Sequence, residues 1–147
     1  ITYHVSPDVD ALGSALALLQ GIRIYGKEAY VISNDIIGDN LGFLPYSLEI
    51  TGEITKPVEK TDCVIVVDCG NYERISADLE NFKGNIINID HHLSNDRYGN
   101  INFINVKAAA TAEIIYEFLL SLNVEINNDI ATCIYTALMT DTGSYRY

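Results

Sequence analysis

The stretch GNIINIDHHLSN, residues 84–95, joins a largely apolar run to an aspartate and two adjacent histidines. Its part at 85–90, NIINID, ends at Asp90, and CVIVVD at 63–68 has the same form and ends at Asp68. Apolar runs of this length are typical of strands that are covered on both faces, as in a parallel sheet. The two runs therefore predict buried strands that each end in a carboxylate.

Further elements extend this pattern toward both ends of the chain. The segments ITYHV at 1–5 and AYVIS at 29–33 indicate two more strands. Apolar residues at helical spacing predict helices over 11–22, 112–122 and 130–139. Strands that alternate with helices are typical of an α/β fold, so we expect three α/β/α layers with a mostly parallel central sheet.

The size and composition indicate one soluble domain. With 147 residues, of which 48% are hydrophobic, the chain can fill a single core but not a second full domain. The sequence contains no apolar run of about 18 residues and no short apolar leader, which argues against a membrane span and a signal peptide. Residue 1 is Ile rather than Met and starts a predicted strand, so we expect residues 1–147 to be one domain of a longer protein.

The cysteines and the charges limit the class of partner. Cys63, Cys69 and Cys133 are odd in number and widely spaced, which argues against a disulfide framework and a thiolate zinc site and favours a reducing, cytoplasmic setting. The formal net charge is −11, and the nine basic residues are scattered. No basic stripe is therefore available to hold a long nucleic acid duplex, although phosphates could still be bound through metal ions.

Histidines and aspartates gather where the predicted strands end. All three histidines of the chain and five of its aspartates follow strands or close the last helical pattern: His4, Asp8, Asp10, Asp68, Asp90, His91, His92 and Asp141. The carboxyl ends of parallel strands meet at one edge of a sheet, where ligands bind in such folds. We therefore expect these side chains to converge, provided that the topology brings Asp141 to the same edge.

Such a cluster of carboxylates favours bound cations. Five carboxylates in a partly dry cleft would repel one another strongly unless they were protonated or neutralised. The mixture of imidazole nitrogen and carboxylate oxygen suits Mn²⁺, Fe²⁺, Co²⁺ or Zn²⁺ better than Ca²⁺. The ligands outnumber those that one ion needs, so we expect two ions, about 3.5 to 4 Å apart, that share a carboxylate and activate a water.

Each residue has a simpler interpretation when it is taken alone. Asp68 could be a turn or helix cap, His4 a partly buried histidine, and Asp8 the start of a helix. The tetrapeptide DTGS at 141–144 also matches the catalytic turn of aspartic proteases. Those proteases are all-β proteins, however, and here the tetrapeptide follows a helical pattern, so the metal site is the preferred hypothesis.

Four motifs in this order resemble those of the DHH family of phosphoesterases, in the RecJ-like superfamily. They are HVSPDVDALGS at 4–14, VVDCGNYERI at 66–75, IDHHLSN at 89–95 and TDTGSYRY at 140–147. The resemblance covers essentially the whole chain. Within the family, DALGSALAL at 10–18, ATAEIIYEFL at 110–119 and the fourth motif are most similar to the NrnA-type bifunctional oligoribonucleases and 3′-phosphoadenosine 5′-phosphate phosphatases.

The resemblance implies a role for each residue of the cluster. It assigns one Mn²⁺ to His4, Asp8 and Asp68. It assigns a second Mn²⁺ to Asp10, Asp68, His91 and Asp141, so that Asp68 bridges the two ions. His92 is expected to face the scissile phosphate and to assist the leaving oxygen if it is protonated, and Asp90 is expected to orient the adjacent histidine. Arg74 and Arg146 are expected either to contact phosphate or to be solvated surface charges.

The activity implied by the resemblance is hydrolysis of a phosphoester by a two-metal mechanism. The expected substrates are short oligoribonucleotides, 3′-phosphoadenosine 5′-phosphate, or both. Other branches of the superfamily suggest a cyclic dinucleotide, its linear product, pyrophosphate or polyphosphate as the substrate. The alternative to an enzyme is a nucleotide-sensing module that binds its ligand without turnover. A homodimer is left open.

Two features of this chain differ from the family pattern. A short serine-containing stretch commonly precedes the threonine that is Thr111 here, whereas this chain has Ala109 and Ala110. Family members also have a smaller C-terminal domain of the DHHA1 type with a glycine-rich, substrate-binding segment, and residues 1–147 contain no such segment. We therefore expect residues 1–147 to be the catalytic DHH domain, which would turn over oligonucleotides poorly without that domain.

Overall fold

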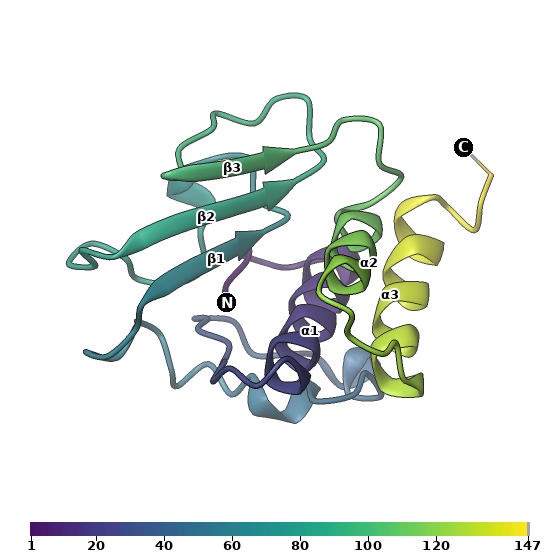
Figure 1. Ribbon diagram of the computed structural model, residues 1–147, viewed down its shortest axis with the longest axis horizontal. Coiled ribbons are helices and arrows are strands. Elements are labelled where there is room, and N and C mark those ends of the chain that lie inside the picture. Colours follow the sequence, from purple (N-terminus) through teal and green to yellow (C-terminus); the bar gives the residue numbers. More distant parts are fainter. Residues whose placement is uncertain (147) are drawn as a thin grey trace.

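A parallel sheet of three strands organises the computed structural model, which describes residues 1–146. The strands are β1 (Cys63–Val67), β2 (Asn85–Asp90) and β3 (Ile101–Ile104), in the order β1-β2-β3, and both pairs are parallel. The α-helices are α1 (Val9–Ile24), α2 (Thr111–Ser121) and α3 (Asn128–Asp141). Short 3-10 helices are η1 (Asp39–Leu41), η2 (Ser47–Glu49) and η3 (Tyr72–Arg74). The predicted α/β fold with a parallel sheet is confirmed (Figure 1).

The strands predicted near the start of the chain are reduced or missing. Residues 1–5 make only isolated bridges, a parallel one from Thr2 to Val66 and an antiparallel one from His4 to Ile75. Residues 29–33, predicted as a strand, form none, although the Ile32 amide donates a hydrogen bond to the Ile1 carbonyl. The strand β3 was not predicted, because it is short and its residues alternate between exposed and half-buried positions.

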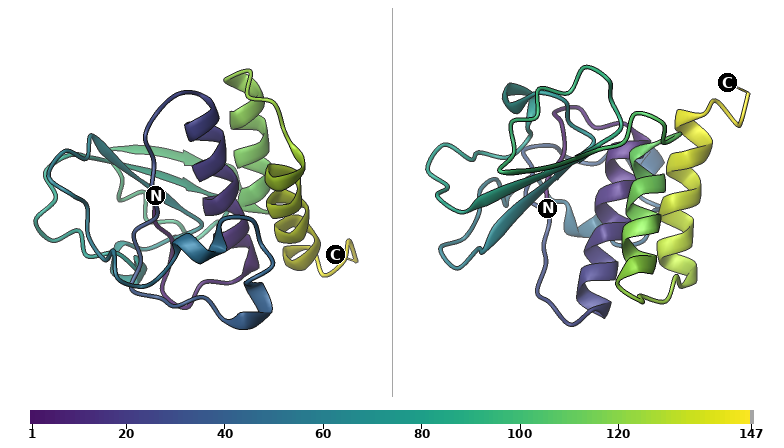
Figure 2. Two further views of the ribbon diagram at one scale, coloured as in Figure 1. Left: turned by 90° about the horizontal axis from the view of Figure 1, so that it is seen from below. Right: turned by 45° about the horizontal axis from the view of Figure 1, so that its top comes forward.

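The three α-helices cover one face of the sheet. Figure 2 shows these helices together on that face. Ile65 and Val67 of β1 and Ile87 and Ile89 of β2 lie in a core that they share with all three helices. Helix α1 packs against both α2 and α3, so it is buried on most sides. A Cβ atom at Gly13 would lie 2.6 Å from the Cys133 carbonyl oxygen of α3. Glycine at this position therefore permits the close contact between α1 and α3.

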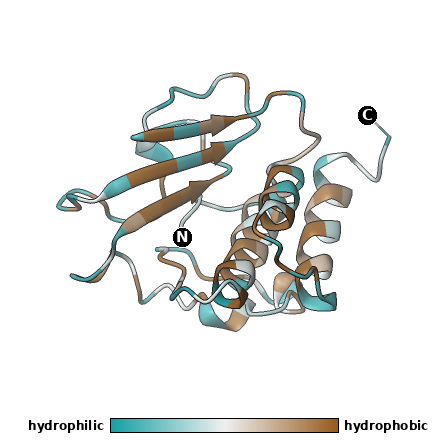
Figure 3. Cartoon of the chain, viewed as in Figure 1, coloured by the Kyte–Doolittle hydropathy of each residue, from teal (hydrophilic) through white to brown (hydrophobic). Residues whose placement is uncertain are grey.

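Irregular segments cover the other face of the sheet. Val64 and Val66 of β1 lie there in a second, smaller core with Ile75, Leu79 and Phe82. Within residues 1–146, this layer consists of connections and η3 rather than a long helix. Figure 3 shows hydrophobic residues along β1 and on the three helices, as expected for strands covered on both faces.

The arrangement brings several element ends to one edge. The strands β1 and β2 are parallel and in register, so Asp68 and Asp90 follow or end neighbouring strands at the same edge of the sheet (Figure 1). Among residues 1–146, no helix combines the length and the apolar character that crossing a membrane requires. The connection at 52–62 contains no regular element and is largely exposed.

Candidate metal centre

The predicted cluster converges at the carboxyl edge of the sheet. The side chains come from the segment before α1, the first turn of α1, the ends of β1 and β2, and the end of α3. Every predicted histidine and carboxylate of the cluster is within 4 Å of another member: His4, Asp8, Asp10, Asp68, Asp90, His91, His92 and Asp141. The cluster divides into two halves around Asp68.

One half is built around His4. Its Nε2 lies 3.8 Å from Asp8 Oδ2 and 3.7 Å from Asp68 Oδ2. Asp8 is also the N-cap of α1, because its Oδ1 accepts a hydrogen bond of 3.0 Å from the Ala11 amide. His4 lowers the pKa of Asp8, and Asp8 raises the pKa of His4. The helix cap thus holds a carboxylate next to the histidine.

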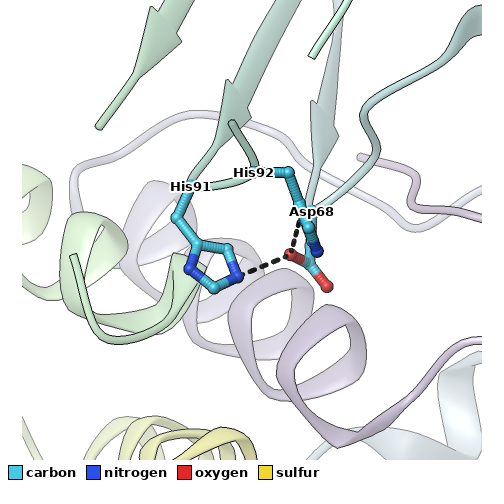
Figure 4. Close-up of side chains that lie close together, drawn as sticks. All are labelled: Asp68, His91 and His92. Carbon is cyan, nitrogen blue, oxygen red and sulfur yellow. Dashed lines mark ion pairs between the residues drawn. The ribbon is translucent and has the colours of Figure 1, made fainter. Parts of the chain in front are cut away.

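The other half is built around His91. Its Nε2 lies 3.8 Å from Asp10 Oδ2, 3.8 Å from Asp68 Oδ1 and 3.7 Å from Asp141 Oδ2. Figure 4 shows the His91 ring directed at the Asp68 carboxylate. Asp141 is the last residue of α3, so the packing of α3 against α1 brings this carboxylate to the sheet edge. The sequence analysis expected Asp141 to join the cluster only if the topology brought it to this edge, and the structure places it there.

Asp68 presents one oxygen to each half. Its Oδ2 faces His4 and its Oδ1 faces His91, and the residue is only 2% exposed. Its φ of 53° lies in the left-handed region, which aspartate tolerates better than most residues and which is common at functional sites. Burial, together with the carboxylates of Asp10 and Asp8, raises the pKa of Asp68 to about 7. Without a cation, this carboxyl group is therefore costly to ionise.

The N-terminus of α2 fixes two of these carboxylates. Ala110 is the N-cap residue and provides no side-chain acceptor. Asp10 takes that role, because Oδ2 accepts a 2.7 Å hydrogen bond from the Thr111 amide and Oδ1 one of 3.0 Å from the Ala112 amide. The Thr111 hydroxyl donates to Asp68 Oδ1 at 2.9 Å. Burial raises the pKa of Asp10 even with these donors in place.

Backbone carbonyls set the orientation of His4 and His91. The Nδ1 atom of His4 lies 2.9 Å from the Val5 carbonyl oxygen, and that of His91 lies 3.3 Å from the Ala108 carbonyl oxygen. A carbonyl only accepts hydrogen bonds, so Nδ1 carries the proton in both rings and the Nε2 lone pair points into the cluster. Histidines that bind metals in proteins are commonly held this way.

His92 lies beside the cluster and has a different partner. Its Nδ1 donates to Asp90 Oδ1 at 2.7 Å. The same atom lies 3.6 Å from Asp68 Oδ1, and Figure 4 shows this ion pair. The bond to Asp90 raises the pKa of His92 to about 9. Burial alone would raise the pKa of Asp90, but hydrogen bonds from His92 and Asn95 outweigh burial and lower it. His92 is therefore a cation at neutral pH, with the outer side of its ring accessible.

Among residues 1–146, three combinations of three residues are close enough to hold an ion. They are His4, Asp8 and Asp68; Asp10, His91 and Asp141; and Asp68, His91 and His92. The third combination requires a free nitrogen on His92, and its Nδ1 is already bound to the buried Asp90. The first two combinations use the His4 and His91 Nε2 atoms, which have no competing hydrogen bond among residues 1–146.

The two predicted arginines lie next to residues of the cluster. The Arg74 carbonyl accepts a hydrogen bond of 2.7 Å from the Val5 amide, and the Arg146 amide donates one of 3.0 Å to the Thr142 carbonyl. Both side chains are exposed, and their phosphate contacts stay a prediction. Tyr147, the end of the fourth motif, lies outside the described residues.

Two surface cavities of this chain lie away from the cluster. Cavities of about 380 and 510 Å³ open at the opposite ends of the strands, beside Gly84 and Cys63. Neither is lined by a residue of the cluster. The chemistry of the cluster, rather than a deep pocket, therefore identifies the candidate site.

Sequence reasoning missed a set of buried amides behind the cluster. Asn88 lies within β2 and is fully buried, and its Oδ1 accepts a 2.8 Å hydrogen bond from Asn95. Asn95 in turn donates to Asp90 Oδ2 at 2.6 Å. The signal was present in the sequence, since an asparagine in the middle of a buried apolar strand needs hydrogen-bond partners.

The sequence matches one family along most of its length. The model of the family described as "DHH family, N-terminal domain" matches residues 1–138. The chain is 36% identical over 151 aligned residues to the "Bifunctional oligoribonuclease and PAP phosphatase NrnA" of Thermus thermophilus, an alignment that covers 100% of this chain and 44% of the relative. It is 26% identical over 144 residues to the "Probable manganese-dependent inorganic pyrophosphatase" of Enterococcus faecalis, covering 95% of this chain and 46% of the relative.

A solved structure shares the fold. The crystal structure of an exopolyphosphatase-related protein from Bacteroides fragilis superposes with a TM-score of 0.86 at 28% identity, covering 99% of this chain and 46% of that one. This chain thus spans less than half of the length of each of these three proteins.

Proposed function

Because the chain belongs to the DHH family, as its N-terminal domain, we propose that it is the catalytic domain of a phosphoesterase that hydrolyses short oligoribonucleotides and 3′-phosphoadenosine 5′-phosphate. The similarity to a bifunctional oligoribonuclease and PAP phosphatase along the whole chain supports this choice of substrates. We propose that the remaining length of the protein supplies a substrate-binding domain, because this chain matches only 44% and 46% of the two relatives.

The observation that supports the proposal most strongly is the position of Asp68 between two histidines. Its two oxygens face the Nε2 atoms of His4 and His91 at 3.7 and 3.8 Å. Ligand atoms that share one transition-metal ion, at about 2.0 to 2.2 Å from it, lie roughly 3 to 4 Å apart. The spacing and the nitrogen and oxygen donors of this cluster therefore fit two divalent ions with Asp68 as the bridging ligand.

The residues divide between the two proposed ions as follows. One ion would be held by His4, Asp8 and Asp68, and the other by Asp10, Asp68, His91 and Asp141. Imidazole and carboxylate donors suit Mn²⁺. The relative from Enterococcus faecalis is named as a probable manganese-dependent enzyme. When bound, the ions would stabilise charge on the phosphoryl oxygens and make a water more acidic.

His92 and Asp90 are proposed to move a proton. Asp90 holds the Nδ1 proton of His92, so the other ring nitrogen faces outward from the buried carboxylate. A cationic His92 can bind a phosphoryl oxygen and donate its Nε2 proton to the leaving oxygen. The bond to Asp90 stabilises this cation before the reaction and keeps the ring oriented.

The test is hydrolysis by the whole protein of a labelled RNA dinucleotide and of 3′-phosphoadenosine 5′-phosphate. We expect cleavage with Mn²⁺, no cleavage with a chelator, and no cleavage by Asp68→Asn. A matched control is Asp129→Asn, which changes an aspartate in the first turn of α3, remote from Asp141 at its last residue. Binding of Mn²⁺ and nucleotide without any turnover would contradict the proposal and favour a nucleotide-sensing module.

Pyrophosphate and polyphosphate are the second candidate substrates. The similarity to a probable inorganic pyrophosphatase and to an exopolyphosphatase-related protein favours them. The two candidates differ in the leaving group, which is a phosphate for pyrophosphate and a nucleoside or nucleotide hydroxyl for the first set. Activity confined to pyrophosphate or to a cyclic dinucleotide in the same assay would replace the first choice.

A further inference from the structure

The carboxylate of Asp90 is held from two sides. It is fully buried, and its Oδ1 accepts hydrogen bonds from the His91 amide at 2.8 Å and from His92 Nδ1 at 2.7 Å. Its Oδ2 accepts a hydrogen bond of 2.6 Å from Asn95 Nδ2. Rotation of the carboxylate about its side-chain bonds would move Oδ1 and would therefore turn the His92 ring. The donor at Oδ2 is in a position to prevent this rotation.

The amide of Asn95 can adopt only one orientation. Its Oδ1 accepts a hydrogen bond of 2.7 Å from the Arg97 amide, and its Nδ2 donates both to Asp90 and to Asn88 Oδ1 at 2.8 Å. A flipped amide would place an oxygen against a carboxylate and an NH₂ group against an N–H group. Asn95 is thus a donor of fixed direction rather than an adaptable contact.

Asn88 anchors this donor to the sheet. Its side chain is fully buried within β2, and its Nδ2 lies 3.3 Å from the Val66 carbonyl, 3.2 Å from the Cys69 carbonyl and 3.0 Å from the Tyr98 hydroxyl. Two of these acceptors flank Asp68 in the chain. The end of β1 and the carboxylate that holds His92 are therefore joined by one network of amides.

We propose that Asn95, anchored by Asn88, is a positioning residue for the reaction: it fixes the Asp90 carboxylate and through it the direction in which His92 faces the substrate. The inference rests on the proposed function for the role of His92 in the reaction. The claim that Asn95 orients the His92 ring concerns only that ring and its hydrogen-bond partners. Asn95 touches neither the proposed metal ligands nor the reacting atoms in this role, so its loss should impair turnover rather than metal binding.

The experiment compares Asn95→Ala with the unchanged whole protein. We expect kcat to fall about 10- to 100-fold, the range typical of supporting residues around a metal site, with little change in KM or in Mn²⁺ affinity. Asn102→Ala is the matched control, because Asn102, which lies in β3, also makes two side-chain hydrogen bonds, both to Gly99. This control should keep its kcat.

A second readout does not depend on activity. In the metal-free protein, the Nδ1 proton of His92 should give a downfield NMR signal because it is hydrogen-bonded to a carboxylate, and His92→Gln identifies that signal. We expect Asn95→Ala to shift or broaden it and Asn102→Ala to leave it unchanged. If Asn95→Ala does not fold, Asn95→Asp has the same shape, keeps the acceptor for Arg97 and lacks the amide donors, and it should show the same loss.

The outcomes separate the inference from the proposed function. An unchanged His92 signal together with an unchanged kcat in the folded Asn95 variant would overturn the inference, as would a parallel loss of Mn²⁺ affinity. If the wild-type protein cleaves none of the phosphoesters, the proposed function fails, while the NMR comparison still shows whether Asn95 positions His92.

Discussion

The hydroxyl of Thr111, at the start of α2, donates a hydrogen bond of 2.9 Å to Asp68 Oδ1, 43 residues away in the sequence. The same Oδ1 faces His91, so the hydroxyl orients the carboxylate that is proposed to bridge two ions. We expect Thr111→Val to weaken Mn²⁺ binding about tenfold, because loss of such outer partners typically costs about 10- to 100-fold in affinity. Titration calorimetry measures this change.

The control for Thr111 is an exposed threonine whose hydroxyl also donates a hydrogen bond. Thr132→Val in α3 removes a hydroxyl that donates to the Asn128 carbonyl, far from the cluster. This variant should bind Mn²⁺ as the wild type does. Equal Mn²⁺ affinity in the wild type and Thr111→Val would show that the hydroxyl does not help to orient Asp68.

Mutation should distinguish the role of His92 from that of the proposed metal ligands. We expect His92→Ala to lose roughly 100-fold or more in kcat, as is typical when a general acid is removed, while it still binds the same number of Mn²⁺ ions. Its Nδ1 is engaged by Asp90, and this is the physical reason for retained metal binding. If the variant instead lost an ion, His92 would be a ligand and the proposed division of roles would be wrong.

The stability of the metal-free protein should fall as the pH rises from about 4 to about 7. The pKa of Asp68 is raised from 3.8 to about 7 in the folded chain, so within this window the folded state holds a proton that the unfolded state has released. The unfolded state then binds fewer protons, and the free energy of unfolding decreases with pH. Urea unfolding in the presence of chelator measures this slope.

A variant isolates the contribution of Asp68 to that slope. Asp68→Asn has no titrating group at this position, so the pH dependence between about 4 and 7 should be weaker than in the wild type. His92, whose pKa is raised to about 9, adds a decrease of the same sign above its ordinary value of 6.5. A slope that is the same in both proteins would mean that Asp68 is not the group that titrates.

The contact between α1 and α3 provides a test of the fold itself. A Cβ at Gly13 would lie 2.6 Å from the Cys133 carbonyl oxygen, so Gly13→Ala should lower the free energy of unfolding by about 1 to 3 kcal/mol. Gly70→Ala is the control, because a Cβ there meets no atom closer than 3.7 Å. Chemical denaturation of the two variants checks this difference, and equal stability would contradict the packing of these helices.

The sequence predicted the elements that are buried on both sides and missed those at the margins. The strands at 63–67 and 85–90 were predicted because both of their faces are covered, which leaves an apolar run. The run at 29–33 was predicted as a strand, but its backbone hydrogen bonds, to Ile1 and Ile54, do not extend into a strand ladder. The segment Ile101–Ile104 has two exposed residues and so lacks the apolar signature, although its backbone completes the sheet.

The candidate site was predictable because parallel strands end at the same edge of a sheet. That rule is enough to bring Asp68 and His91 together, and the family resemblance supplied the pairing of the other residues. The supporting network could not be predicted in the same way, since the partner of Asn88 is seven residues away and that of Thr111 is 43 away. The cytoplasmic location and the exclusion of long duplexes remain predictions.

The most direct test of the proposed two-ion site is the number of Mn²⁺ ions that the whole protein binds, measured by titration calorimetry and by electron paramagnetic resonance. We predict two ions per chain with a spectrum of magnetically coupled Mn²⁺ in the wild type, and loss of the coupling in Asp68→Asn. One ion per chain, or two uncoupled ions that Asp68→Asn leaves unchanged, would contradict the bridging role of Asp68.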